Sequence, residues 1–272
     1  MSVTKDLIQV NALYEGTFSV GLDKKFVRIN RDDPPKKGSL KLSINPFLIR
    51  CRDKNILFDA GLGDFGEDTT TDIIRNNLEK FKLSEYDITD VFTSHLHYDH
   101  IGGLAGKSNG YWELTFPEAR LWVSRNEWEK LTHLDGATDD ETKIDFIHFL
   151  DARADIQFLD EKDQPYPEIR VWEVGGHTEF SQVLFVDKED HKYMMAGDVI
   201  GRRMAFQKKF KAKFDFDPDK ALKKREELKK LAYEHNYTVL AYHESKTPIF
   251  NVTGYDQDQG YTTESIADRE SA

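Results

Sequence analysis

The sequence predicts an α/β protein that folds as one domain. Nine short runs rich in β-branched and aromatic residues are bounded by turn-forming or charged residues, as is typical of strands. Three other segments repeat apolar residues at helical spacing and lie between these runs. No internal repeat and no linker rich in proline, glycine or serine divides the 272 residues. We therefore expect one domain over residues 1–261 and a frayed tail over residues 262–272.

The strand-like runs share an apolar centre and a turn or charge at each end. They cover residues 7–13, 45–51, 55–61, 90–95, 119–124, 169–175, 182–187, 192–198 and 238–243. The helical segments cover residues 69–81, 139–152 and 217–236, and they begin with threonines, with Asp139 and Asp140, and with Asp217 before Pro218. The polar insertion 21–39 lies outside this pattern, and we expect it to form part of a pocket wall.

Composition narrows the classes of partner. Hydrophobic residues make up 39% and charged residues 32%, and the formal net charge of -11 argues against binding nucleic acid. The first residues contain neither a signal-like segment nor an apolar span, so we expect a cytoplasmic protein with no membrane partner. The single cysteine, Cys51, fits a reducing compartment. A basic stretch over residues 202–213 is either a solvated face or an anion-attracting rim.

The stretch TSHLHYDHIGG concentrates metal-ligating residue types. His95, His97, Asp99 and His100 occupy six consecutive positions. A lone histidine is more often a hydrogen-bonded core residue, but one metal centre satisfies all four of these side chains. The stretch therefore predicts a metal site.

The spacing of these residues indicates two adjacent metals. His95 and His97 follow an apolar strand, and alternate residues of an extended segment point the same way, so they can bind one ion. Asp99 and His100 come after the chain turns and face a neighbouring point. Further candidates, His177, Asp198 and His243, each end a strand-like run on which a ligand can be held rigidly.

These motifs together resemble the metallo-β-lactamase superfamily. HLHYDH matches its central motif, NILFDAGLG its early aspartate turn, GGHT its third histidine motif and MAGDV its bridging-aspartate motif. The resemblance implies a four-layer αββα sandwich with the metals at one edge of the two sheets. It further implies that one metal is held by His95, His97 and His177, the other by Asp99, His100 and His243, and that Asp198 bridges them.

The implied ligands suit hydrolysis. Three neutral imidazoles leave an ion its full charge and an open position, so that bound water ionises near neutral pH. We expect two zinc ions, although manganese, cobalt or iron would fit the same ligands. Asp198 and Asp99 are the expected catalytic carboxylates, one bridging the metals and the other moving a proton. Asp59 either orients a ligand histidine or simply forms a turn.

Differences between this sequence and several branches of the metallo-β-lactamase superfamily reduce the number of expected functions. Asp198 argues against a true β-lactamase, His97 against a flavodiiron oxidoreductase, and the short chain after His243 against a glyoxalase II-type thioesterase. The segment 197–228 resembles N-acyl homoserine lactonases and methyl-parathion-hydrolase-like esterases, except that Gly201 stands where well-known lactonases have tyrosine. We expect lactone opening by a metal-bridging hydroxide, as in quorum quenching. A phosphotriesterase, an aryl esterase, a thioesterase, a persulfide dioxygenase and a non-catalytic metal-binding module remain alternatives.

A small-molecule ester or lactone is the expected partner, and a homodimer is left open. Tyr98 and Tyr242 flank ligands and either donate to an oxyanion or pack. Aromatic residues near the ligand segments either line the substrate pocket or fill the core; they are Phe180, Phe206, Phe210 and Phe250. Four further histidines lack partner residues in the sequence and are expected to be ordinary: His133, His148, His191 and His235.

Overall fold

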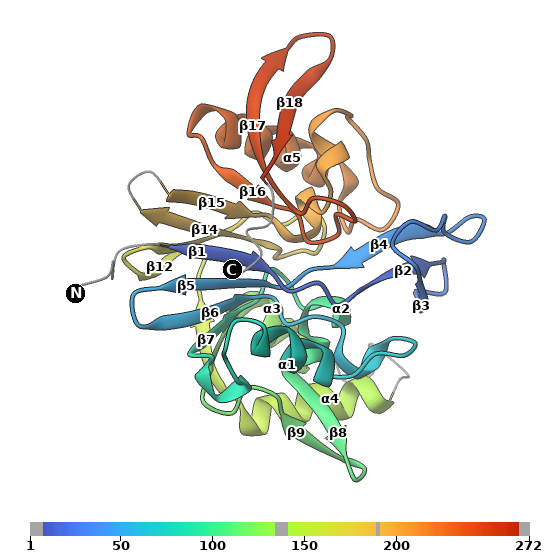
Figure 1. Ribbon diagram of the computed structural model, residues 1–272, viewed down its shortest axis with the longest axis vertical. Coiled ribbons are helices and arrows are strands. Elements are labelled where there is room, and N and C mark those ends of the chain that lie inside the picture. The colour runs from blue at the N-terminus through green and yellow to red at the C-terminus, as the bar shows by residue number, and fades with distance from the viewer. Residues whose placement is uncertain (1–7, 134–140, 189–190, 267–272) are drawn as a thin grey trace.

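Two β-sheets packed face to face form the centre of the molecule (Figure 1). The computed structural model describes residues 8–133, 141–188 and 191–266. In order across the first sheet the strands are β1 (Gln9–Ala12), β5 (Phe47–Cys51), β6 (Lys54–Phe58), β7 (Asp90–Phe92), β10 (Arg120–Ser124) and β11 (Asp155–Leu159). Across the second they are β12 (Lys162–Tyr166), β13 (Ile169–Glu173), β14 (Gln182–Lys188), β15 (His191–Met195), β16 (Thr238–Leu240), β17 (Ile249–Asp256) and β18 (Gly260–Ser265).

Helices cover the outer face of each sheet (Figure 1). The first sheet packs against α1 (Asp72–Glu79), α3 (Arg125–His133) and α4 (Glu141–Arg153), and the second against α5 (Pro218–Glu234). A short helix, α2 (Tyr98–Ile101), lies in the loop after β7. Two small sheets complete the fold: β3 (Phe26–Ile29), β2 (Gly16–Val20) and β4 (Leu40–Ile44) form one, and β8 (Ala105–Ser108) and β9 (Tyr111–Leu114) the other.

The alternation of side chains along the strands separates three apolar layers. In β5, Phe47 and Ile49 enter the core between the sheets, whereas Leu48 points to the helices of the first sheet. In β14, Leu184 enters the same central core and Phe185 packs toward α5. Strands buried on both faces read as continuous apolar runs. The resulting order of helix, sheet, sheet and helix confirms the predicted four-layer αββα sandwich.

All nine strand-like runs contain a strand, and all three helical segments contain a helix. The best-defined start is that of α5, where the Asp217 carboxylate accepts hydrogen bonds from the backbone N–H groups of Asp219 and Lys220. Pro218 occupies the first turn, as expected from its fixed φ. Asp139 and Asp140, expected to begin the second helix, lie outside the described residues.

Two expectations about irregular segments need correction. The insertion 21–39 contains strand β3, which pairs with β2, so it is not wholly irregular. Residues 262–265 are not frayed, because they belong to β18 and pair along β17 past the boundary placed at residue 261. The backbone ladder stabilises β18 although its sequence, GYTTES, has little apolar character. Residues 267–272 of the expected tail lie outside the described residues.

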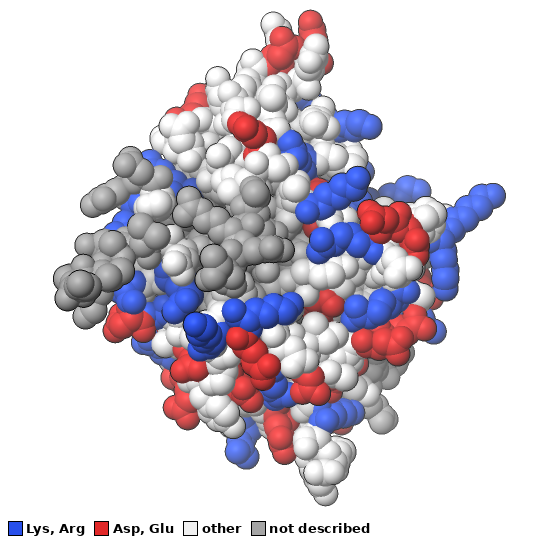
Figure 2. All heavy atoms as spheres, viewed as in Figure 1, with Lys and Arg blue, Asp and Glu red and all other residues white. Residues whose placement is uncertain are grey.

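The surface agrees with the mixed charge of the sequence. On the face shown in Figure 2, lysine and arginine side chains are interspersed with aspartate and glutamate. Within the described residues, no helix is both long and apolar enough to cross a membrane.

The N-cap of α5 provides a test of the fold. We expect Asp217→Ala to lower the free energy of unfolding of the metal-free protein by about 1 kcal/mol, because two backbone N–H groups lose their acceptor. Asp217→Asn keeps an acceptor and should stay close to wild type. Urea denaturation of both variants measures the difference, and equal stability of Asp217→Ala and wild type would contradict the capping role.

Candidate metal centre

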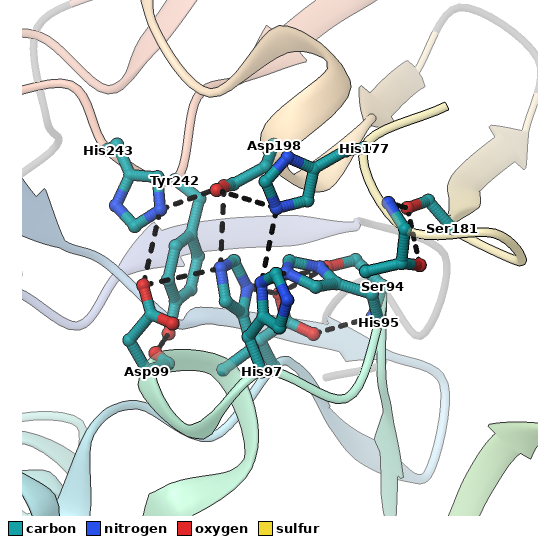
Figure 3. Close-up of polar contacts among 12 residues, drawn as sticks. Ser94, His95, His97, Asp99, His177, Ser181, Asp198, Tyr242 and His243 are labelled. Atoms are coloured by element: carbon teal, nitrogen blue, oxygen red, sulfur yellow. Dashed lines mark hydrogen bonds and ion pairs between the residues drawn. The ribbon is translucent and has the colours of Figure 1, made fainter. Parts of the chain in front are cut away.

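Seven polar side chains converge where strands of the two sheets end (Figure 3). Those following β7 come from the first sheet: His95, His97, Asp99 and His100. The others come from the second sheet: His177 from the loop between β13 and β14, Asp198 from the turn after β15, and His243 from the segment after β16. The structure therefore brings together every residue that the sequence analysis put forward as a metal ligand.

Three imidazoles form one group. Nδ1 of His97 lies 3.0 Å from Nε2 of His95 and 3.2 Å from Nε2 of His177. A tetrahedral ion with metal–nitrogen bonds of about 2.0–2.1 Å holds its nitrogens roughly 3.3 Å apart. The three nitrogens are thus spaced as the ligands of one small cation would be.

The second group combines imidazoles and carboxylates. Oδ2 of Asp99 lies 3.5 Å from Nε2 of His243 and 3.7 Å from Nε2 of His100. Oδ1 of Asp198 lies 2.8 Å and 3.4 Å from the same two nitrogens, whereas its Oδ2 lies 3.3 Å from Nε2 of His177. The two oxygens of Asp198 therefore face different groups, and Figure 3 draws the contacts that run from this carboxylate to His243 and His177.

Several of these atoms are buried without a hydrogen-bond partner among the described residues. They are Nε2 of His100, Nε2 of His243 and Oδ1 of Asp198. A buried polar atom without a partner costs free energy. Because all three face the second group, a divalent cation there would satisfy them together, so this donor set fits a metal.

The opposite ring nitrogen of four of the histidines is held by an oxygen. Nδ1 of His100 donates to Oδ2 of Asp59 over 2.6 Å, and Nδ1 of His177 to Oδ1 of Asp215 over 3.0 Å. Nδ1 of His243 donates to the Ser43 carbonyl over 2.9 Å, and Nδ1 of His95 lies 3.1 Å from Oγ of Ser94. Such bonds fix the tautomer and direct Nε2 inward.

Asp59 does more than form a turn, because its carboxylate holds the imidazole of the candidate ligand His100. Besides His100, its carboxylate accepts the Ser94 N–H over 2.6 Å and the Ser94 hydroxyl over 2.7 Å. Asp215 and Ser43 were missed by sequence reasoning. Asp215 lies in an aromatic-rich stretch whose only signal was the following helix cap, and Ser43 contributes a backbone carbonyl, for which no residue type is a signal.

Burial and mutual proximity favour neutral imidazoles at His95 and His97, whereas at His177 the neighbouring Asp198 and Asp215 outweigh burial and raise the pKa. Burial, with further lowering by His177, reduces the pKa of His97 to about 4, and burial beside His100 places the pKa of His95 well below its usual range. Burial opposes the charged form of Asp198, but His243 and His177 outweigh it and hold the pKa of this carboxyl well below its usual range. Neutral imidazole and ionised carboxylate are the metal-binding forms.

Two glycines let the ligand loops approach their supports. Gly197, before Asp198, has φ +46°, and a Cβ there would lie 2.6 Å from Oγ of Ser94. Gly176, before His177, has φ +106°, and a Cβ there would lie 2.8 Å from the Ala221 nitrogen of α5. Larger residues would strain both turns. Ser181 closes the His177 turn by accepting the Thr178 N–H over 2.7 Å.

The two flanking tyrosines pack against the site. The buried Tyr242 ring stacks on His100 at 4.1 Å, and its hydroxyl donates to the Asp99 carbonyl over 2.7 Å. Tyr98 packs against Phe65 at 4.7 Å. Tyr242 therefore supports the loop of Asp99, and its hydroxyl is already engaged.

A cleft of about 330 Å³ opens beside the first group. Besides His97 and His177, its lining residues are Leu96, Glu127, Lys130, Leu131, Thr178, Glu179, Phe180, Phe214 and Phe216. Of the four aromatics considered from sequence, only Phe180 lines this cleft. Phe206 and Phe250 are buried and pack edge to face at 5.5 Å, and Phe210 packs against the same core cluster. No residue of the insertion 21–39 lines it.

Comparison with known proteins places this geometry in a family. Residues 41–243, which span all seven converging side chains, match the family model described as the metallo-beta-lactamase superfamily. The chain belongs to the metallo-beta-lactamase superfamily. Membership supports a hydrolase that uses divalent metal ions. No protein with a curated description matches the sequence.

Solved structures share the fold of this superfamily member. A probable metal-dependent hydrolase from Staphylococcus aureus has a TM-score of 0.78 at 18% identity, with 98% of this chain and 99% of that chain covered. AidC, described as a dizinc quorum-quenching lactonase, has a TM-score of 0.76 at 21% identity, with 98% and 97% covered. AbOPH, described as a hydrolase of the beta lactamase superfamily, has a TM-score of 0.74 at 20% identity, with 95% and 94% covered.

The contact between Asp59 and His100 predicts an effect on metal affinity. We expect Asp59→Asn to weaken metal binding about 10- to 100-fold, because the amide cannot accept from His100 and both Ser94 donors as the carboxylate does. Asparagine tolerates the φ of +58° at this position. Chelator competition measures the affinity. Asp68→Asn, at an exposed aspartate with φ +52°, is the matched control, and equal affinities of the two variants would refute the orienting role.

Proposed function

We propose that this chain is a dinuclear metal-dependent hydrolase that opens lactone esters, with N-acyl homoserine lactones as its substrates. The observation that carries the proposal is the sharing of the Asp198 carboxylate between two groups of ligand atoms. One group is His95, His97 and His177, and the other is Asp99, His100 and His243. Two zinc ions fit this set, as do manganese, cobalt or iron.

The protein's own residues have separate tasks in this reaction. Bound metals would supply a water-derived nucleophile at neutral pH and polarise the substrate oxygen. Asp198 sets the separation of the two groups. Asp99, held by the Tyr242 contact to its carbonyl, takes up the proton released by the attacking water. The hydrogen-bonded rings of His100, His177 and His243 would hold the reaction at one edge of the two sheets.

The cleft supports a substrate with an apolar group. Leucine and phenylalanine side chains form much of its wall, and Lys130 lies 5.2 Å from the Phe216 ring and 6.0 Å from the Phe180 ring. Such a wall suits an acyl chain next to the first group. The descriptions of AidC and of an N-acyl homoserine lactone hydrolase, bound to N-hexanoyl-L-homoserine and 20% identical to this chain, name the same substrate class.

A phosphotriester or an aryl ester is the second candidate. The same nucleophile attacks phosphorus, and the same cleft holds an aryl leaving group. A parallel kinetic panel of short- and long-chain acyl homoserine lactones, an aryl phosphotriester, an aryl ester and a glutathione thioester distinguishes these functions. A thioester preference of about a hundredfold in kcat/KM, or roughly 2.7 kcal/mol, would overturn the lactonase assignment.

Metal content tests the centre directly. We expect about two transition-metal ions per chain by elemental analysis of protein prepared without chelators, because seven ligands are present. Asp198→Ala should lose metal and nearly all activity, whereas Asp32→Ala, at an exposed aspartate, should lose neither. Wild-type protein with no bound metal would reject the mechanism.

The cleft wall predicts a chain-length effect. We expect Phe216→Ala to raise KM about tenfold for a long-chain lactone and much less for a short-chain one, because a contact with the acyl chain worth about 1.5 kcal/mol is lost. The backbone N–H of residue 216 still donates to the His177 carbonyl, so the centre is preserved. Phe158→Ala, at an exposed phenylalanine outside the cleft, is the control. An equal change for both lactones would contradict this substrate position.

A further inference from the structure

Three arginines lie in or against the segment that follows Asp198. Two of them, Arg203 and Arg225, donate hydrogen bonds to other parts of the chain. Arg203 donates through Nε to Oγ1 of Thr263 over 2.6 Å and through Nη1 to Oγ1 of Thr247 over 3.3 Å. Arg225 donates to the Val199 and Phe210 carbonyls, each over 2.7 Å. The guanidinium of Arg202, by contrast, has no hydrogen bond or ion pair with the part of the chain that the structure describes.

The backbone places Arg202 next to the candidate centre. A Cβ on the preceding Gly201 would lie 3.5 Å from Oδ1 of Asp198 and 3.2 Å from Cδ2 of His243. The Gly201 carbonyl accepts the His243 N–H over 2.8 Å, and the Arg203 N–H donates to Oε2 of Glu244 over 3.1 Å. Residue 202 is therefore held from both sides against the segment that carries His243.

The surroundings leave Arg202 charged and incompletely neutralised. Burial lowers the pKa of its guanidinium, while Asp198 and Glu244 favour the charged form. Arginine stays protonated under such conditions, and this half-buried guanidinium has no charged partner of its own within the described residues. Asp198 already faces the two ligand groups. The guanidinium is therefore available to a negatively charged oxygen of a substrate held at the centre.

The lysines that follow Arg202 in the chain are exposed, whereas Arg202 is half-buried. Within the basic stretch 202–213, Lys211 pairs with Asp219 over 2.5 Å, and Lys209 lies 3.9 Å from Glu226. Their exposed side chains fit the solvated-face interpretation of this stretch. Lys208 and Lys213 are exposed as well, so the half-buried Arg202 is the residue of this stretch to which we apply the anion-attracting interpretation.

We propose that Arg202 is a catalytic residue that donates a hydrogen bond to the substrate oxygen on which negative charge develops during hydrolysis. The role rests on the proposed function. In a lactone, water adds to the acyl carbon and the C=O π pair moves to the carbonyl oxygen, facing Arg202. Reformation of C=O breaks the ring C–O bond, and the leaving alkoxide takes the proton that the water released. Tyr242 cannot make this contact while its hydroxyl donates to Asp99.

The first test compares Arg202→Gln and Arg202→Lys in the metal-loaded full chain. We expect Arg202→Gln to lower kcat/KM about 100-fold, mainly through kcat, as for removal of one oxyanion donor, with metal content unchanged. Arg202→Lys should recover part of the rate, and millimolar guanidinium should partly restore Arg202→Ala. Arg153→Gln, at an exposed arginine at the end of α4, is the matched control and should match wild type.

A second readout does not depend on the identity of the substrate. Inorganic phosphate is a tetrahedral oxyanion, and calorimetry should show at least tenfold weaker phosphate binding to Arg202→Gln than to wild type or Arg153→Gln. Unchanged phosphate affinity with kcat/KM within twofold of wild type would overturn the proposal. A rate loss matched by loss of metal would also overturn it by assigning a structural role. If wild type hydrolyses no member of the panel, the proposed function fails, and phosphate binding alone decides whether Arg202 contacts oxyanions.

Discussion

The Asp198 carboxylate joins the two halves of the molecule. Its own strand, β15, belongs to the second sheet, and so do the strands that carry His177 and His243. The candidate ligands after β7 belong to the first sheet, so the seven side chains converge only when the two sheets pack in the correct register. Metal binding at such a site would contribute to folding stability, because the unfolded chain does not hold these groups together. The apolar layer between the sheets and the polar edge therefore depend on each other.

An outer layer of hydrogen bonds extends this dependence to the rest of the chain. Asp59, at the end of β6, fixes His100, and Asp215, just before α5, fixes His177. The Ser43 carbonyl of β4 fixes His243, which connects the small three-stranded sheet to the centre. The position of a ligand nitrogen is thus set by elements that carry no ligand, and changes in those elements can alter metal affinity without touching a metal ligand.

What the sequence could predict follows from how local each signal is. The central strands were predictable because burial on both faces makes them continuous apolar runs. HLHYDH was informative because four candidate metal ligands lie within six consecutive residues. Strand β18 was missed because its backbone partners stabilise a polar sequence. Phe214 and Phe216 line the cleft only through the path of the chain before α5, and a missing partner, as at Arg202, becomes visible only when the neighbours of every donor are known.

Arg202 and the cleft lie beside different ligand groups of the candidate centre. The cleft adjoins His97 and His177, whereas Arg202 follows Gly201, whose carbonyl accepts the His243 N–H. If Arg202 contacts the substrate oxygen as proposed, the reacting carbonyl or phosphoryl group would lie between the two sides and its apolar group would point to Phe216. Glu127, whose pKa burial raises to about 7, and Glu179 add carboxylates to the cleft wall, of which Glu179 pairs with Lys130. We expect such a wall to disfavour the two carboxylates of a glutathione thioester and to accept a neutral acyl or aryl group, because Lys130, the lysine in its lining, is already paired with Glu179.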